Sequence, residues 1–475
     1  MLKYNIMIKK LTFILLIFGL CFTQAWADTI SLAPQDISSL EPIKKQDRIL
    51  ICAPHPDDES IGCAGVIQQA LNAGAKVKVV YLTNGDANQL AFMVYEKRLT
   101  FKKKEFIHMG EVRRQEAIKA MQFLGLKEDD LIFLGYPDFG TFKIFSQYWS
   151  DQRAYKSILT RVRSVPYKEN FSYGSAYIGQ NVLRDLEKIL LDYKPNKIFV
   201  SHPADTNVDH KSFYLFLQVA LRNLRKDKEL KNAKVYPYLI HCVGWPLPRH
   251  YHPDIGLEPP KNFLGTQINW LKFDLAPEQL KKKHEAILKY KSQTESSAFY
   301  LLAFARRNEL FGDYPEIQLE KKPSLKEKAI SFFGLSKMFE ESESDTAQDL
   351  KAPLEEKEQV SYALKDNHLL IQVEKTRELS SRYGVLVYIF GYSDNTPFAD
   401  MPKLRIITKH KKFRVFDKRT MINPEGISLD LQSNSLIIKI PLEILGNPDF
   451  ILTSMKAYGE KLPVDSIGFR RIEIK

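Results

Sequence analysis

Short apolar stretches alternate with longer amphipathic ones through the first two thirds of the chain. The short stretches are rich in β-branched residues, which is typical of buried strands, and the longer ones repeat apolar residues every three or four positions, as helices do. This alternation predicts an α/β fold with a mostly parallel sheet and helices on both faces. The clearest predicted strands are residues 48–54, 76–83, 131–134, 196–201 and 237–243, and the clearest predicted helices are residues 62–73 and 112–124.

Residues 138–180 interrupt the alternation with a high density of Phe, Tyr and Trp. Such a segment could form one wall of a substrate cleft. Aromatic side chains at this density are more often ordinary core packing, so both interpretations stay open.

The character of the chain changes after residue 317. Residues 318–358 are dominated by charged and small polar side chains, which predicts a flexible linker holding one short helix around Ile330–Met338. We therefore predict an α/β domain over residues 28–317 and a C-terminal antiparallel β-sandwich over residues 359–475. The strands that predict the sandwich are residues 368–375, 384–392, 403–408, 412–416, 427–431 and 435–441.

Residues 1–27 have the features of a signal peptide. Two lysines precede the apolar run Leu11–Phe22, and Ala25-Trp26-Ala27 offers a cleavage site. The run is shorter than the roughly 20 residues that span a bilayer. We expect an exported chain, periplasmic or secreted, with no stable membrane span after cleavage; an uncleaved N-terminal anchor is the alternative.

The chain carries a formal net charge of +12, from 69 Lys and Arg against 57 Asp and Glu. The basic residues are scattered rather than clustered, which argues against nucleic-acid binding and fits dispersed, solvated charge. Removal of residues 1–27 would leave Cys52, Cys63 and Cys242, and an odd number of cysteines excludes a fully paired disulfide framework.

The strongest chemical signal is the heptapeptide APHPDDE at residues 53–59, directly after the first predicted strand. A His and two acids in a turn at the carboxyl end of a strand can converge on one point. His55 and Asp58 are three residues apart in a bend, a spacing that lets both reach one metal ion. Asp57 then points elsewhere and is available for proton transfer.

A third ligand should follow another strand. Residues 202–210, which follow the strand at 196–201, end in Asn207-Val208-Asp209-His210. His210 is the best candidate for a ligand, with Asp209 as a polar partner in the site. Such a nitrogen and oxygen donor set suits zinc, although another divalent metal is possible.

The two segments APHPDDE and NVDH together resemble the PIG-L (LmbE-like) family of zinc-dependent N-acetylglucosaminyl deacetylases. The resemblance extends over roughly residues 45–300. Four further segments support it, namely residues 83–86, 112–116, 136–138 and 290–293.

The resemblance implies a Rossmann-like α/β fold, with His55, Asp58 and His210 as zinc ligands and Asp57 as general base. It also implies that Arg113 contacts the substrate, although Arg113 could instead pair with Glu116 on the same helix.

One position departs from the family pattern, because Asn207 stands where a His is usual. An amide can donate a hydrogen bond to an oxyanion but cannot deliver a proton near neutral pH. We predict that Asn207 and Asp209 contact the substrate.

These features predict an exported zinc-dependent hydrolase that removes N-acetyl groups from an N-acetylglucosamine-type sugar of an envelope glycan or glycoconjugate. One alternative is a zinc amidase acting on another N-acyl compound. The other is a glycan-binding protein with a weakened catalytic domain. The sandwich could bind carbohydrate or have a structural role, and the sequence does not indicate an oligomeric state.

Overall fold

The computed structural model describes most of the chain from residue 37 onwards. Its two units are residues 1–37 and 38–475. The predicted signal peptide and nearly all of the predicted linker, with its short helix, lie outside the described residues. The described ranges are residues 37–97, 102–150, 154–263, 266–320, 359–374, 384–409, 412–423, 425–432, 434–458 and 468–475.

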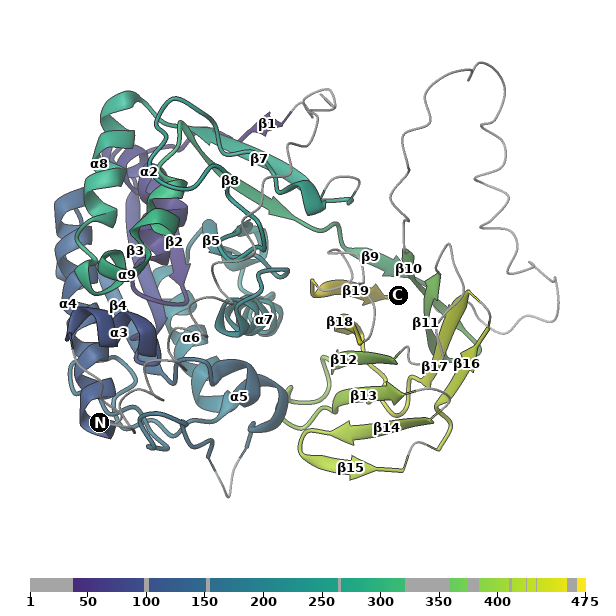
Figure 1. The fold of residues 1–475 in the computed structure, drawn as a ribbon. Coiled ribbons are helices and arrows are strands. Elements are labelled where there is room, and N and C mark those ends of the chain that lie inside the picture. Colours follow the sequence, from purple (N-terminus) through teal and green to yellow (C-terminus); the bar gives the residue numbers. More distant parts are fainter. Residues whose placement is uncertain are drawn as a thin grey trace, which may run out of the picture. The chain divides into compact units, whose positions relative to one another are not determined.

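An eight-stranded sheet forms the centre of the α/β domain, in the order β1-β7-β8-β6-β5-β2-β3-β4 (Figure 1). Every neighbouring pair is parallel except the two pairs that involve β8. This confirms the predicted mostly parallel sheet. The strands are β1 (Ser38–Ser39), β2 (Arg48–Ala53), β3 (Lys76–Thr83), β4 (Leu131–Tyr136), β5 (Lys197–Ser201), β6 (Lys234–Tyr238), β7 (Asn269–Asp274) and β8 (Asn308–Asp313).

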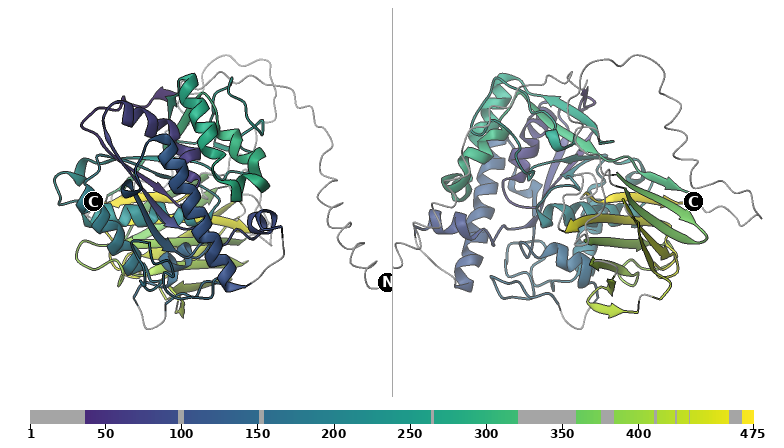
Figure 2. Two further views of the ribbon diagram at one scale, coloured as in Figure 1. Left: turned by 90° about the vertical axis from the view of Figure 1, so that its left-hand side faces the viewer. Right: turned by 45° about the vertical axis from the view of Figure 1, so that its right-hand side comes forward.

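Helices cover both faces of this sheet. On one face α2 packs against α4 and α8, and on the other face α7 packs against α5 and α6 (Figure 1 and Figure 2). The helices are α2 (Asp58–Asn72), α3 (Gln89–Tyr95), α4 (Lys103–Leu124), α5 (Thr141–Gln147), α6 (Gly179–Tyr193), α7 (Val208–Asn223), α8 (Pro277–Ile287) and α9 (Lys291–Leu301). Short 3₁₀ turns add η1 (Glu128–Asp130), η2 (Leu230–Asn232), η3 (Lys261–Phe263) and η4 (Leu302–Phe304).

One predicted strand is misplaced. The prediction put a strand at residues 237–243, whereas β6 spans Lys234–Tyr238 and the chain leaves the sheet after it. The cause is a polar contact, because the backbone N–H groups of Ile240 and His241 donate to the Asp205 carboxylate instead of to a neighbouring strand.

The C-terminal region consists of two sheets that enclose a common apolar core, as predicted for a β-sandwich. All strand pairs are antiparallel except β19 with β9, a strand that crosses the predicted boundary between the α/β domain and the linker. One sheet has the order β10 (Gln359–Lys365), β11 (His368–Glu374), β17 (Ser435–Pro441) and β16 (Ser428–Leu431). The other has the order β15 (Thr420–Ile422), β14 (Lys412–Asp417), β13 (Lys403–Lys409), β12 (Gly384–Tyr392), β18 (Phe450–Tyr458), β19 (Arg470–Ile474) and β9 (Ile317–Leu319).

The sandwich and the α/β domain share one aromatic cluster. The ring of Phe145 on α5 lies 5.2 Å from that of Phe390 and 5.7 Å from that of Phe398. Arg222 on α7 donates to Glu473 on β19 at 2.8 Å. Half of the aromatic residues of 138–180 are buried in the core, and Phe142 and Tyr148 are partly buried against it. Phe139 is the aromatic residue of this segment on the cavity described below.

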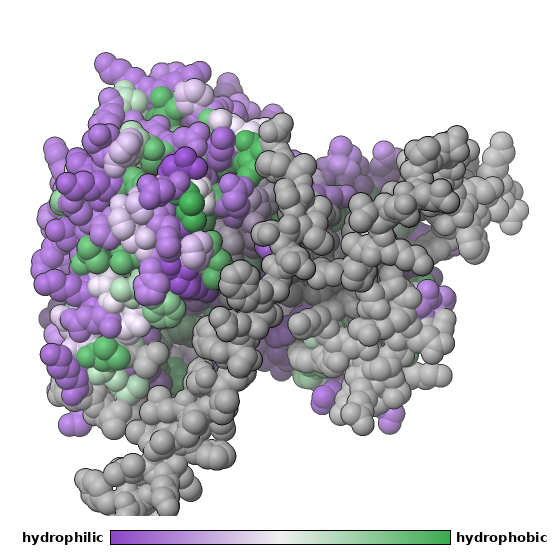
Figure 3. Space-filling model, turned by 45° about the horizontal axis from the view of Figure 1, so that its top comes forward, coloured by the Kyte–Doolittle hydropathy of each residue, from purple (hydrophilic) through white to green (hydrophobic). Residues whose placement is uncertain are grey.

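The face of the α/β domain drawn in Figure 3 is largely hydrophilic. In Figure 3, hydrophobic residues on the α/β domain form small groups separated by hydrophilic ones. Within the described ranges, none of the helices combines the length and apolar character that crossing a membrane requires.

Candidate active site

Polar side chains gather where neighbouring strands end. His55 follows β2, Asp138 follows β4, the segment 202–210 follows β5, and His241 follows β6. Because β2, β5 and β6 are adjacent and parallel, their carboxyl ends lie side by side. These ends border a cavity of about 400 Å³, to which α9 also contributes.

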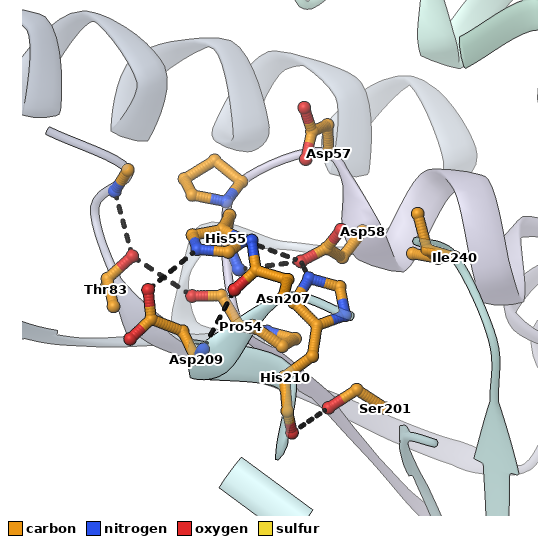
Figure 4. A network of polar contacts seen from close by, with 12 residues as sticks. Pro54, His55, Asp57, Asp58, Thr83, Ser201, Asn207, Asp209, His210 and Ile240 are labelled. Carbon is orange, nitrogen blue, oxygen red and sulfur yellow. Dashed lines mark hydrogen bonds and ion pairs between the residues drawn. The ribbon is translucent and has the colours of Figure 1, made fainter. Parts of the chain in front are cut away.

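The three predicted metal ligands converge. Asp58 Oδ2 lies 3.2 Å from His55 Nδ1 and 3.1 Å from His210 Nε2, and all three side chains are buried. Figure 4 shows both rings reaching the Asp58 carboxylate while Asp57 points away. One ligand atom from each of the three residues lies within 4.8 Å of one from each of the others. Two imidazoles and one carboxylate around an open position fit a catalytic metal site.

Further carboxylates hold the remote nitrogens of the two histidines. His210 Nδ1 lies 3.0 Å from Asp205 Oδ2, and His55 Nε2 lies 3.2 Å from Asp138 Oδ1. Burial alone would lower the pKa of His210, but the charges of Asp205 and Asp58 outweigh it and raise that pKa to about 9. Carboxylates placed in this way orient metal-binding imidazoles and increase their basicity.

Asp57 stands beside the three ligands in a strained backbone conformation, with a φ of 125°. Its N–H donates to the Glu59 carboxylate at 3.1 Å, so Glu59 braces the loop. Arg113 Nη2 donates to Asp57 Oδ2 at 3.2 Å and to the Pro56 carbonyl at 2.8 Å. Burial raises the pKa of Asp57 to about 7, against the opposing charge of Arg113.

The guanidinium of Arg113 therefore already has hydrogen-bond partners within the site. Its Nη1 donates to the Gly85 carbonyl at 3.0 Å, and a Cβ at Gly85 would collide with the guanidinium. Glu116 does not pair with Arg113; it accepts from the backbone N–H of Ser292 at 2.9 Å and from its hydroxyl at 2.6 Å. Arg113 does line the cavity, and its contact with substrate stays a prediction.

Asn207 and Asp209 are the other two predicted substrate contacts, and only Asn207 lies on the cavity. Asn207 lines the cavity and caps α7, since its side-chain oxygen accepts from the Asp209 N–H at 2.8 Å. Asp209 is fully buried behind His55 and accepts from the N–H of Phe139 at 2.6 Å and of Thr141 at 3.1 Å. A role in substrate contact stays a prediction for both, but the partners shown for Asp209 are structural.

Sequence reasoning missed His241, because it placed this residue inside a strand. The imidazole lines the cavity and packs edge-on against His210, with ring centroids 4.7 Å apart. Its other side faces the Tyr300 ring at 6.1 Å. Burial lowers the pKa of His241 to about 4. His241 could have been recognised from the sequence only if the end of β6 had been predicted correctly, at Tyr238.

Residues 50–221 match the family model PIG-L, described as GlcNAc-PI de-N-acetylase. This segment is similar to the PIG-L family. It spans just over a third of the chain and contains His55, Asp57, Asp58 and His210.

Two curated proteins show similarity in sequence. A glucosamine-6-phosphate deaminase-like protein of Bacteroides thetaiotaomicron is 24% identical over 290 residues, which cover 53% of this chain and 36% of that protein. A 1D-myo-inositol 2-acetamido-2-deoxy-alpha-D-glucopyranoside deacetylase of Kineococcus radiotolerans is 32% identical over 112 residues, which cover 22% of this chain and 27% of that protein. The matches thus span about a third of the length of these relatives.

Solved structures show more distant similarity. N,N'-diacetylchitobiose deacetylase of Pyrococcus horikoshii is 18% identical, with a TM-score of 0.33 and coverage of 56% of this chain and 84% of that one. A 4-carboxy-2-hydroxymuconate hydratase of Pseudomonas putida is 16% identical, with a TM-score of 0.33 and coverage of 58% and 98%. Scores at this level do not discriminate between these two activities.

Proposed function

We propose that this chain is an exported, zinc-dependent hydrolase that removes the N-acetyl group from an N-acetylglucosamine-type sugar of a glycan or glycoconjugate. The observation that carries the proposal is the meeting of His55, Asp58 and His210 at one cavity, with Asp57 beside them. The PIG-L match over the residues that hold this group supports it. Export is inferred from the signal-peptide features of residues 1–27.

The donor set suits zinc, which would be held by His55, Asp58 and His210. When bound, zinc polarises an amide carbonyl and lowers the pKa of water. Asp205 and Asp138 keep the two imidazole rings in position for this role.

Asp57 is the group placed to move protons. Its carboxylate accepts a proton from the attacking water, while the water oxygen forms a bond to the acetamide carbon. The carbon–nitrogen bond then breaks, and Asp57 returns the proton to the departing amine nitrogen. The products are acetate and the free amino sugar. Arg113 keeps the carboxylate in place through its contacts with Asp57 and Pro56.

Replacing Asp57 with Asn tests the proposal. The Asp57→Asn variant should bind zinc as the wild type does but release acetate at least about 100-fold more slowly, because it cannot take up the proton. The measurement is acetate release from N-acetylglucosamine and its short oligomers, with zinc content determined by atomic absorption.

Asp192→Asn, on the end of α6 away from the cavity, is the matched control and should leave the rate unchanged. Equal rates for the wild type and Asp57→Asn would remove Asp57 from this role. No acetate from the zinc-loaded wild type, with release of another acyl group instead, would replace the proposal with a different amidase.

A further inference from the structure

His241 is held firmly by its backbone. Its N–H donates to Asp205 Oδ2 at 2.9 Å, and its carbonyl accepts from the N–H of Thr206 at 2.9 Å and from the Thr206 hydroxyl at 3.1 Å. Asp205 also holds His210, so the same carboxylate fixes a metal ligand and the loop that carries His241. The position of the imidazole is therefore tied to that of the candidate metal group.

The imidazole of His241, unlike its backbone, is not held in place by hydrogen bonds to the described residues. Within the described ranges, neither of its ring nitrogens has a hydrogen-bond partner, although the residue is partly buried and lines the cavity. Its ring is confined between His210 at 4.7 Å and Tyr300 at 6.1 Å. A confined imidazole with unused nitrogens is suited to meeting a polar group of a bound molecule.

Two other polar side chains on the cavity already have partners. Arg113 is bound by Asp57 and two backbone carbonyls, and the side-chain oxygen of Asn207 caps α7. Asp57 approaches the candidate metal group from the side of α4, which holds it through Arg113. His241 approaches from the loop after β6, on the side of His210.

We propose that His241 donates a hydrogen bond to the carbonyl oxygen of the acetamide group under attack, an inference that rests on the proposed function. The donor is strongest where negative charge develops on that oxygen, so it stabilises the transition state more than the bound substrate. His241 is thereby a substrate-contacting catalytic residue that supplements the amide of Asn207.

The first test compares His241→Ala with His241→Gln in the full, zinc-loaded chain. His241→Ala should lower kcat for acetate release about 100-fold and change KM little, because the contact matters most in the transition state. His241→Gln, which keeps an N–H donor, should recover a substantial part of kcat. Zinc content should equal that of the wild type in both variants.

His252→Ala is the matched control, because His252 lies on the same loop and is bound to the Arg249 carbonyl at 2.8 Å, outside the cavity. It should retain wild-type kcat. Wild-type kcat in His241→Ala, when the wild type itself releases acetate, would overturn the role of His241 and leave the proposed function intact.

A second measurement does not depend on turnover. Acetohydroxamate carries the same acyl carbonyl and binds zinc, and its affinity for the zinc-loaded protein can be measured by calorimetry. His241→Ala should weaken its binding about tenfold, and His252→Ala should not. If the wild type releases no acetate, the proposed function fails. In that case an unchanged acetohydroxamate affinity in His241→Ala would also overturn the contact proposed here.

Discussion

At the scale of single residues, the site depends on Asp57 being kept in a conformation that few residues other than glycine adopt. A φ of 125° is strained for an aspartate, and such strain persists only where the surroundings enforce it. Glu59 binds the N–H of Asp57, and Arg113 binds its carboxylate and the preceding carbonyl. Together these contacts turn Asp57 away from the metal group and towards the cavity.

Arg113→Lys should therefore impair catalysis without removing the metal. A lysine cannot make the forked contacts to Asp57, Pro56 and Gly85, so we expect a loss of about 100-fold in kcat from misplacement of the carboxylate. The positive charge of Arg113 lowers the pKa of Asp57, so Arg113→Gln, which removes that charge, should raise the pKa and move the acid limb of the pH–rate profile to higher pH. Arg114→Gln, one residue along α4, is the control; an unshifted profile in Arg113→Gln would contradict the role.

The residues of the candidate site were predictable to different degrees. His55, Asp57 and Asp58 lie in one short segment, so their spacing alone indicates that they meet. His241 and Asp205 could not be found in this way, because their contact depends on where two strands end. The burial of Asp209 behind His55 likewise follows from packing, which a local pattern does not contain.

At the scale of elements, a charged cluster links the N-terminal strand region to the sheet. Glu41 accepts from Lys197 at the start of β5 and from Lys234 at the start of β6, both at 2.7 Å, and from Tyr236 at 2.8 Å. The hydrogen bonds from the two lysines lower the pKa of Glu41 from 4.5 to about 2. The segment after residue 37 is thus joined to two strands by one carboxylate.

Glu41→Gln should lower stability in a pH-dependent manner. Because the pKa of Glu41 is depressed in the folded state, its contribution is complete above pH 4.5 and is lost as the pH falls towards 2. The carboxylate is partly exposed, so we expect a loss of no more than about 1 kcal/mol at pH 7. Thermal unfolding of the wild type and of Glu41→Gln at several pH values measures this loss of stability. Glu320→Gln, at an exposed carboxylate, is the control, and a difference that persists at pH 2 would contradict the assignment.

Many strands with regular apolar patterns were predictable, but β8, which carries a buried charge, was not. β8 contains Glu309, which is buried and accepts from the N–H groups of Gly65 at 2.7 Å and Val66 at 3.1 Å. Lys283 on α8 pairs with the same carboxylate at 2.8 Å. A polar residue in this position obscures the pattern of a strand, and its partners are distant in the sequence.

At the scale of the whole molecule, aromatic residues of the sandwich pack against the α/β domain. Phe390, Phe398 and Phe469 are buried in the shared cluster rather than exposed for stacking on sugars. Glycan binding by this region stays a prediction, but these three side chains do not supply its surface.

Phe145→Ala should destabilise both regions together. Phe145 is fully buried and contacts Phe216, Phe390 and Phe398, so removing its ring should cost about 3–5 kcal/mol. Urea unfolding followed by circular dichroism and by tryptophan fluorescence should show one shifted transition for both signals. Two separate transitions in the wild type would contradict a shared core. Phe171→Ala, at an exposed ring in the same segment, is the control.

Support for the candidate site also comes from a strand that lies far along the chain from it. β19 lies between β18 and β9, and Phe469 just before it packs against Phe142 on α5. α5 begins at Thr141, whose N–H binds Asp209 beside His55. Because a ribosome makes the chain from its N-terminus, Phe469 emerges long after His55 and His210. The α/β domain therefore waits for the sandwich before α5 has all of its packing partners.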